Sequence, residues 1–461
     1  MFDLNIHNYR SFQNQNLKFS RINILIGENS GGKSSLLKFL LALKQTIDSP
    51  NEVNLKLKGD YTDLGNYEEV IYNKKKTKKL KFGFESQVEY HNFFNDSIDL
   101  FEKNVTKKLK DTILNVVEKN INSKTIISFE ISSKLNEHSS IETIIENEQI
   151  GELRIIQDAT NSDDSFRELS CDLVFNFNKF SGTIEKCISF KEGFFTLIGQ
   201  ELKSQCQKLF ENNFEEIYYS IVYLLIFQNF VSEEIDRIRF VNPIGTNPKR
   251  FYFQEDKKAS YKLIDIEKFI NVIGDPTLTE REYKERIAIL NKTIKEFGIA
   301  EEIDVIKDKL LPVLALNVKT KGFWSNITDV GYGVSLQIPI LFQAIMSEKY
   351  TRKGQTILIE QPEVHLHPTL QAKFIETLLG IGNKNVYFIE THSEHIVRKL
   401  QVLIKENKFK LKPEDITIHY FKREPTKFEV SEHKILENGK LSPAFPQGFF
   451  DASYSLVKQL L

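Results

Sequence analysis

The segment Gly27-Glu28-Asn29-Ser30-Gly31-Gly32-Lys33-Ser34 decides how the rest of this sequence is interpreted, because it fits the phosphate-loop pattern G-x-x-x-x-G-K-[ST]. It follows an apolar run at 22–26, typical of a buried strand, and precedes a stretch at 35–41 with a broad apolar helical face. Glycines let the backbone curl around phosphates, and the N–H groups at a helix start offer partial positive charge. The segment therefore predicts a nucleoside triphosphate site, the alternative being a glycine-rich turn without a ligand.

The side chains of this loop supply the expected ligands. We expect Lys33 to reach the terminal phosphates as a point charge and the Ser34 hydroxyl to take one Mg²⁺ position. The cofactors implied are ATP and Mg²⁺. The residues predicted to contact the nucleotide here are Asn29, Ser30, Gly31, Gly32, Lys33, Ser34 and Ser35.

The composition sets the size and the charge of the molecule. The chain has 461 residues, with 62 Lys and Arg against 63 Asp and Glu, for a formal net charge of −1. This length allows a large core and about two to three domains. Because the net charge is close to zero, no global electrostatic field favours nucleic acid or acidic lipid, and any DNA contact has to be local.

Cysteine usage and the apolar stretches indicate a cytoplasmic protein without a membrane partner. Three cysteines share no C-x-x-C spacing, which fits a reducing compartment. The N-terminus lacks the basic start and unbroken apolar run of a signal peptide. The most apolar segment, 217–231, contains polar residues and is shorter than the roughly 20 residues that span a bilayer, so we expect a buried helix.

Residues 1–90 are expected to form the N-terminal half of an ATPase lobe. Strand-like segments at 4–9 and 17–19 precede the phosphate loop as an antiparallel pair, which favours an ABC-type over a kinase-type P-loop domain. After a glycine-marked link, alternation resumes at 80–85 and predicts an edge hairpin.

Residues 91–235 have a different pattern and are interpreted as an insertion with helices and short strands. No heptad of apolar positions persists over several turns, which argues against the long coiled-coil arms of SMC-type proteins. The expected elements are an amphipathic helix around 100–117 and strands around 125–130, 152–157 and 171–177.

Residues 236–461 are expected to form the C-terminal half of the ATPase lobe, with a charged helical segment at 263–311. Alternating strands and helices follow, as in a parallel sheet. The predicted fold class is therefore α/β: an ABC-type P-loop ATPase head with an α+β/helical insertion. The alternating elements are a helix after Gly333, a strand at 356–359, a helix at 368–379, a strand at 386–389 and a helix after Ser393.

Two apolar strands end in polar side chains that would complete the site. Glu360 follows the strand at 356–359, and we expect it to hold Mg²⁺ opposite Ser34; a strand capped by a polar turn is the alternative. His392 follows the next strand and either donates to the γ-phosphate or packs in a turn while Ser393 caps a helix.

The motif His365-x-His367 has two interpretations as well. Two histidines at this spacing can bind a metal, but such a pair more often shapes a loop. Pro368 at the first helical position supports the loop.

Four motifs in order resemble those of the OLD-like, ABC-type AAA ATPases of bacteria. They are G-E-N-S-G-G-K-S-S-L-L, the segment D-V-G-Y-G-V-S at 329–335, I-E-Q-P-E-V-H-L-H-P and E-T-H-S-E-H. The match extends more loosely to 8–12, 242–252 and 446–451, and 91–232 contributes almost nothing.

The resemblance implies a head-to-tail homodimer or a higher oligomer, in which two heads enclose two nucleotides. Gly331, Gly333 and Ser335 match the signature position that contacts the partner's γ-phosphate, although the L-S-G-G-Q of transporters is absent; a plain helix cap is the alternative. Arg10 resembles a phosphate-contacting arginine of repair ATPases in this superfamily, or forms a surface ion pair.

One departure from the family pattern concerns catalysis. ABC ATPases usually carry a glutamate directly after the Mg²⁺ carboxylate, whereas this chain has Gln361. An amide orients water but does not readily accept its proton. Hydrolysis is then slow, or Glu363 or His392 acts as the base.

The resemblance implies a sensor or scaffold that controls a separate effector, expected to be a nuclease, in bacterial antiphage defence. No D-x-D cluster follows His392, so no two-metal nuclease is assigned to this chain. The segment 446–461, with Phe449, Phe450 and Tyr454, either docks the effector or packs on its own core.

The alternative is a DNA-repair or chromosome-maintenance ATPase that clamps duplex DNA. The run Lys74-Lys75-Lys76-Thr77-Lys78-Lys79-Leu80-Lys81 supports it, unless these lysines simply form a solvated turn. A transporter motor is disfavoured because the transporter signature is missing.

Overall fold

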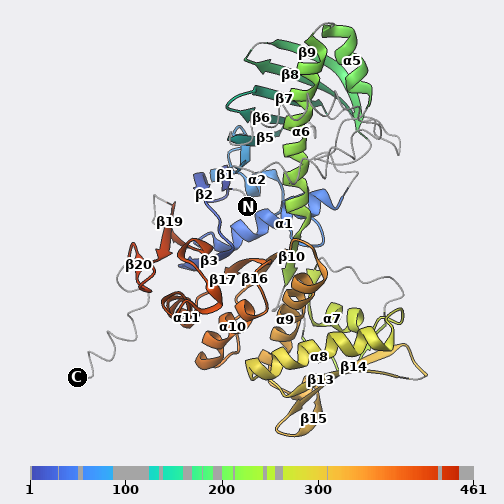
Figure 1. Ribbon diagram of the computed structural model, residues 1–461, viewed down its shortest axis with the longest axis vertical. Coiled ribbons are helices and arrows are strands. Elements are labelled where there is room, and N and C mark those ends of the chain that lie inside the picture. Colours follow the sequence, from blue (N-terminus) through green and yellow to red (C-terminus); the bar gives the residue numbers. More distant parts are fainter. Residues whose placement is uncertain are drawn as a thin grey trace. The chain divides into compact units, whose positions relative to one another are not determined.

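In the computed structural model, the described part of the chain divides into two compact units (Figure 1). The first unit contains Met1–Phe19 and Lys38–Asp236, and the second contains Ser20–Leu37 and Arg237–Leu461. Predictions for Ser30, for the helix around 100–117 and for 446–461 lie outside the described residues. The structure describes residues 3–29, 31–49, 55–86, 124–133, 139–158, 169–178, 180–190, 200–210, 213–241, 247–254, 263–308, 310–423 and 428–445.

The first unit contains an eight-stranded antiparallel sheet in the order β2-β1-β4-β5-β6-β7-β8-β9. Its strands are β1 (Asp3–Tyr9), β2 (Phe12–Leu17), β4 (Leu80–Ser86), β5 (Thr125–Ser133), β6 (Ser139–Asn147), β7 (Gly151–Asp158), β8 (Leu169–Phe177) and β9 (Ser181–Phe190). Its helices are most of α1 (Lys33–Ile47), α2 (Tyr67–Val70), η1 (Tyr72–Lys74), α5 (Gln200–Phe210) and α6 (Phe214–Asp236).

Aromatic side chains form part of the core of this unit. The ring of Phe82 on β4 lies 5.2 Å from that of Phe39 on α1 and 5.0 Å from that of Phe129 on β5, measured between centroids. The long helix α6 packs against β5 and β6 (Figure 1). It contains the apolar segment 217–231 and confirms the buried helix predicted there. Among the described helices, none is both long and apolar enough to cross a bilayer.

The predicted edge hairpin at 80–85 is wrong, because β4 is an interior strand. It pairs with β1 on one side and with β5 on the other. The partner β5 begins at Thr125, far along the chain, and alternation within β4 carries no information about that pairing. The antiparallel pair β1–β2 and the strands predicted near 125–130, 152–157 and 171–177 are confirmed.

The second unit contains an eight-stranded sheet in the order β12-β10-β16-β17-β3-β18-β19-β20, parallel from β12 to β18 and antiparallel beyond. Its strands are β3 (Ile22–Gly27), β10 (Ile238–Val241), β12 (Leu263–Ile264), β16 (Thr356–Glu360), β17 (Val386–Glu390), β18 (Ile416–Arg423), β19 (Phe428–Ile435) and β20 (Leu441–Ser442). A smaller sheet contains β11 (Tyr252–Phe253), β13 (Glu302–Lys307), β14 (Val313–Thr320) and β15 (Phe323–Asn326).

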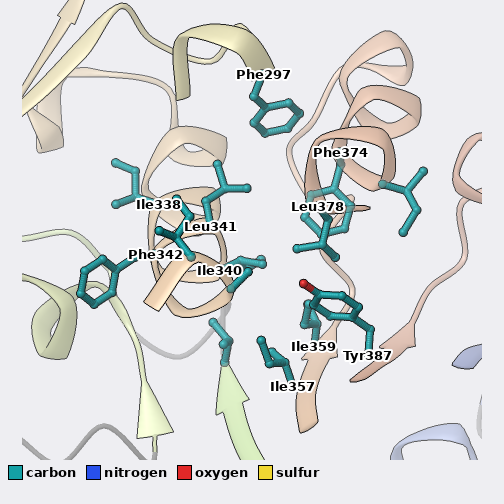
Figure 2. Close-up of a cluster of buried hydrophobic side chains, with 14 of the residues drawn as sticks. Phe297, Ile338, Ile340, Leu341, Phe342, Ile357, Ile359, Phe374, Leu378 and Tyr387 are labelled. Atoms are coloured by element: carbon teal, nitrogen blue, oxygen red, sulfur yellow. The ribbon is translucent and has the colours of Figure 1, made fainter. Parts of the chain in front are cut away.

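Helices cover the parallel strands and exclude water from them. In Figure 2, apolar side chains of two helices and of the end of a third lie beside side chains of β16 and β17. Phe342 and Phe374 are labelled on the helices, and Tyr387 is labelled on β17. The helices of this unit are α7 (Ile266–Ile273), α8 (Glu280–Phe297), α9 (Tyr332–Tyr350), α10 (Pro368–Gly380) and α11 (Glu394–Lys405), with short turns η3 (Ile327–Asp329), η4 (Lys408–Lys410) and η5 (Pro413–Asp415).

The predicted α/β class and the alternating elements after Gly333 are confirmed by α9, β16, α10, β17 and α11. The helical segment expected at 263–311 contains α7 and α8, but it also contains strands β12 and β13. Strand β13 forms because Ile303 and Val305 alternate with polar residues and pair with β14. Our sequence predictions did not include β18, which lies beside β3.

Candidate functional site

The phosphate loop joins β3 to α1 within the second unit. Every residue of β3 is buried, so the strand fixes where the loop begins. Gly27 has φ +144°, and a Cβ there would lie 2.1 Å from the carbonyl oxygen of Phe421 on β18. Gly32 has φ +94°. Gly27 is required because a side chain would collide with β18, and Gly32 is required because its backbone conformation is unfavourable for other residues. These two glycines are therefore needed for the backbone conformation of the loop itself.

Lys33 turns back onto the loop that precedes it. Its Nζ donates to the carbonyl oxygens of Gly27 at 3.0 Å and Glu28 at 2.8 Å, and only 3% of the residue is exposed. Burial lowers the pKa of Lys33, against the opposing charge of nearby carboxylates, among which Glu390 contributes most. The ammonium group of Lys33 therefore lies against the loop backbone. Phosphate oxygens of a bound nucleotide would take the place of the two carbonyl oxygens as its hydrogen-bond acceptors.

Ser34 meets an acidic side chain that our sequence predictions did not assign. Its Oγ donates to Oε1 of Glu390 at 2.8 Å, and Glu390 is 3% exposed. Glu390 ends β17, which lies between β3 and β16 in the sheet. A sequence signal for Glu390 was available, because an apolar strand ends in this carboxylate as another ends in Glu360. The sequence held no signal for its pairing with Ser34.

Glu360 and Glu390 stand at the same level of neighbouring parallel strands, as register partners. Gln361 follows in a left-handed conformation, φ +44°, and its backbone N–H donates to the carbonyl oxygen of Glu390 at 2.7 Å. The chain therefore turns sharply as it leaves β16. The sheet brings Ser34 and two carboxylates to one edge, and such a donor set fits Mg²⁺, which takes one or two carboxylates together with phosphate oxygens. Among the described residues, no group of three or more His, Cys, Asp or Glu forms a separate metal cluster.

Glu363 and His392 lie together beside this edge. The backbone N–H of His392 donates to Oε1 of Glu363 at 2.6 Å. Burial raises the pKa of Glu363 despite the donors around it. Partial burial of the ring and the charge of Lys33 lower the pKa of His392, so the imidazole is neutral near pH 7. The pair thus offers a carboxylate with raised basicity and a neutral imidazole within the field of Lys33.

The segment of Gly331, Gly333 and Ser335 starts α9. Ser335 is 2% exposed, and its Oγ donates to the carbonyl oxygen of Tyr332 at 2.7 Å, so the hydroxyl is engaged within the chain. A Cβ at Gly333 would lie 2.8 Å from the carbonyl oxygen of His365, whereas one at Gly331 would have no heavy atom within 4 Å. Of the three, Gly331 is the position with open space where a Cβ would stand.

A buried amide connects this helix to the turn after β16. Gln337 on α9 is fully buried, and its Nε2 donates to the carbonyl oxygen of Pro362 at 2.7 Å. Pro362 lies between Gln361 and Glu363. The start of α9 and the acidic turn are therefore held by one hydrogen bond.

The remaining predicted residues have different surroundings. Asn29 is exposed, and the backbone N–H of Ser35 donates to the carbonyl oxygen of Gly32 at 3.1 Å. Arg10 belongs to the first unit, where its Nη2 donates to the carbonyl oxygen of Leu64 at 3.3 Å. Its predicted phosphate contact remains a prediction.

Capping explains two of the polar residues near the site. His367 is the N-cap of α10 and accepts from the N–H of Thr369 at 3.3 Å through Nδ1. Ser393 is the N-cap of α11. These contacts favour the loop and cap interpretations over a metal site at the histidine pair.

Taken with the parallel sheet, the loop between β3 and α1 and the acidic ends of its neighbours define a P-loop ATPase head. A family model described as AAA ATPase domain matches residues 1–397, and the chain belongs to this family. A second model, described as protein of unknown function (DUF3696), matches residues 411–460. None of the curated proteins compared with the chain matches it.

Solved structures of SMC heads match the chain at low sequence identity. A crystal structure of the SmcHead bound to the C-winged helix domain of ScpA is 10% identical, with a TM-score of 0.43, over 94% of this chain and 97% of that chain. An SMC head domain from Thermotoga maritima is 8% identical, with a TM-score of 0.34, over 93% and 97%. The Smc head domain with an extended coiled coil, bound to the C-terminal domain of ScpA derived from Pyrococcus furiosus, is 10% identical, with a TM-score of 0.38, over 99% and 98%.

Proposed function

We propose that this ATPase binds ATP with Mg²⁺, hydrolyses it slowly, and uses the bound nucleotide to hold two copies together head to tail. The observation that carries the proposal is the meeting of Lys33, Ser34 and acidic strand ends at one edge of the parallel sheet. Lys33 and the loop N–H groups hold the phosphates, and Ser34 and Glu360 hold the metal ion. Mg²⁺, when bound, neutralises phosphate charge.

In this proposal the residues after the strands prepare the attacking water. Gln361 orients it, and Glu363 or His392 accepts its proton. Because an amide stands where a carboxylate usually does, the chemical step is slow. ATP binding, more than turnover, then sets the state of the protein.

The partner's nucleotide is contacted through the start of α9, with Gly331 and the N–H groups that follow it facing the other subunit. The engaged hydroxyl of Ser335 leaves the backbone as the main donor in this proposal. Arg10, which belongs to the first unit, is proposed to contact a phosphate.

We further propose that the paired form acts as a sensor or scaffold for a separate effector, a nuclease, in bacterial antiphage defence. The resemblance of four motifs to OLD-like ATPases supports this role.

The test is ATP-dependent pairing of the purified chain, measured by light scattering with calorimetry of ATP binding. Lys33→Ala is expected to weaken ATP binding about 10–100-fold, because a charged contact to phosphate is lost. Gly331→Arg is expected to bind ATP but stay unpaired, since a Cβ at this position has no described heavy atom within 4 Å and the long side chain would extend outward from it. Gly331→Ala is the matched control and should pair normally.

Two outcomes would contradict the proposal: no ATP binding by the wild type, or pairing of Gly331→Arg equal to that of the control. Co-purification with the product of a neighbouring nuclease gene, lost in Lys33→Ala, is the expected result for the effector.

A clamp on duplex DNA, for repair or chromosome maintenance, is the second candidate because Lys74 and Lys75 are exposed. Other lysines of the run have local partners: Lys76 lies 2.8 Å from Glu68, and Lys79 lies 3.1 Å from Glu130. This pairing weakens the candidate, since engaged lysines release fewer counterions. A steep salt dependence of duplex binding that Lys74→Gln with Lys75→Gln abolishes would favour the clamp over the scaffold.

A further inference from the structure

The hydrogen bond between Ser34 and Glu390 is the starting point. A carboxylate that is 3% exposed accepts from the hydroxyl of the phosphate loop at 2.8 Å. Burying an ionised carboxylate is unfavourable unless positive charge or donors compensate it. The hydroxyl of Ser34 supplies one such donor, so Glu390 is in direct contact with the phosphate loop.

The sheet order places Glu390 between the two motifs that handle a nucleotide. Strand β17 lies between β3, which leads into the phosphate loop, and β16, which ends in Glu360. Glu390 is the register partner of Glu360, and its carbonyl oxygen accepts from the N–H of Gln361 at 2.7 Å. It therefore contacts both the loop serine and the acidic turn.

We propose that Glu390 is a second carboxylate of the metal site, which holds the divalent cation together with Ser34 and Glu360. This inference rests on the proposed function. Without a cation, the carboxylate holds the Ser34 hydroxyl in place. With a cation, the negative charge of Glu390 strengthens the binding of the metal and hence of the metal–nucleotide complex.

If Glu390 binds the metal, its negative charge matters; if it only accepts a hydrogen bond from Ser34, a neutral acceptor is sufficient. Glu390→Gln keeps the shape and an acceptor for Ser34, but it removes the charge. A structural role would leave the effect of Mg²⁺ on ATP affinity unchanged. A metal role makes that effect depend on the charge.

The experiment measures the Kd for ATP by calorimetry in EDTA and in saturating Mg²⁺, and takes the ratio of the two. Glu390→Gln is expected to reduce the strengthening by Mg²⁺ about 10–100-fold, the usual range for residues that tune a metal site. In EDTA its affinity should equal or exceed that of the wild type, because a negative charge near the phosphates is gone. Glu429→Gln, at an exposed position of β19, makes the same change in net charge and should behave as the wild type.

An unchanged Mg²⁺ effect in Glu390→Gln would overturn the inference, whereas absence of ATP binding by the wild type in both conditions would overturn the proposed function instead. Thermal unfolding checks that the variant is folded. If it is not, Glu390→Asp retains the charge at a shorter reach and is expected to lose part of the Mg²⁺ effect. Failure of both variants to fold would indicate a purely structural carboxylate and would also overturn the inference.

Discussion

At the scale of single residues, Gln361 is the main departure from the motif pattern that the sequence resembles. It stands directly after Glu360 in a left-handed backbone conformation, with its N–H bound to Glu390. In the proposed function, its amide orients the attacking water where a carboxylate would also accept a proton. Glu363, whose pKa is raised by burial, is the nearest alternative base in the sequence.

Gln361→Glu is expected to raise the rate of ATP hydrolysis about 100-fold, the low end of what a positioned general base contributes. ATP affinity should change little, because the phosphates are held by the loop. Phosphate release under single-turnover conditions measures the step. Gln361→Leu serves as the control and should not accelerate. A rate in Gln361→Glu no higher than that of the wild type would contradict the proposal that the amide makes the chemical step slow.

At the scale of elements, the site depends on helices that pack over β16 and β17. Phe374 on α10 is fully buried and lies 6.4 Å from the ring of Phe297 at the end of α8. Figure 2 shows both rings near the side chains of α9. This packing holds the strand ends that present Glu360 and Glu390.

Phe374→Ala is expected to lower the free energy of unfolding by about 3–5 kcal/mol, through lost burial and the cavity that remains. Urea unfolding followed by circular dichroism measures the change. Phe323→Ala removes the same ring from a position that is 76% exposed and should change stability by less than about 0.5 kcal/mol. Equal effects of the two substitutions would contradict the packing described here.

At the scale of the whole molecule, buried histidines make stability depend on pH. Burial, with a contribution from Lys434, lowers the pKa of His419 to about 3. Burial also lowers the pKa values of His7, His392 and His433. These groups are neutral in the folded state and bind protons more readily when the chain unfolds.

The unfolded chain therefore takes up more protons below its histidine pKa of about 6.5, and stability falls as the pH falls through that value. His419 contributes up to about 1.4 kcal/mol per pH unit in this window. The raised pKa of Glu363 acts in the opposite direction, but it is a single group. Urea unfolding at pH 7.5 and pH 5.5 tests this, and His419→Phe should reduce the difference. Stability that is equal at both pH values would contradict the prediction.

The sequence by itself determined the phosphate loop, the two acidic or polar strand ends and the helices that follow them. These are local features: the glycine spacing around Lys33, the apolar runs before Glu360 and His392, and the cap at Ser393 are all contained in short segments. Local patterns suffice because backbone conformation and helix capping depend on near neighbours.

Only the tertiary structure decided which of these ends meet. Ser34 and Glu390 are 356 residues apart, and their contact follows from the order of β3, β17 and β16 in the sheet, which alternation along one strand does not encode. The same reason accounts for the interior position of β4. The start of α9 is another example: a Cβ at Gly333 would lie 2.8 Å from the carbonyl oxygen of His365, and this close approach depends on a segment distant in the sequence.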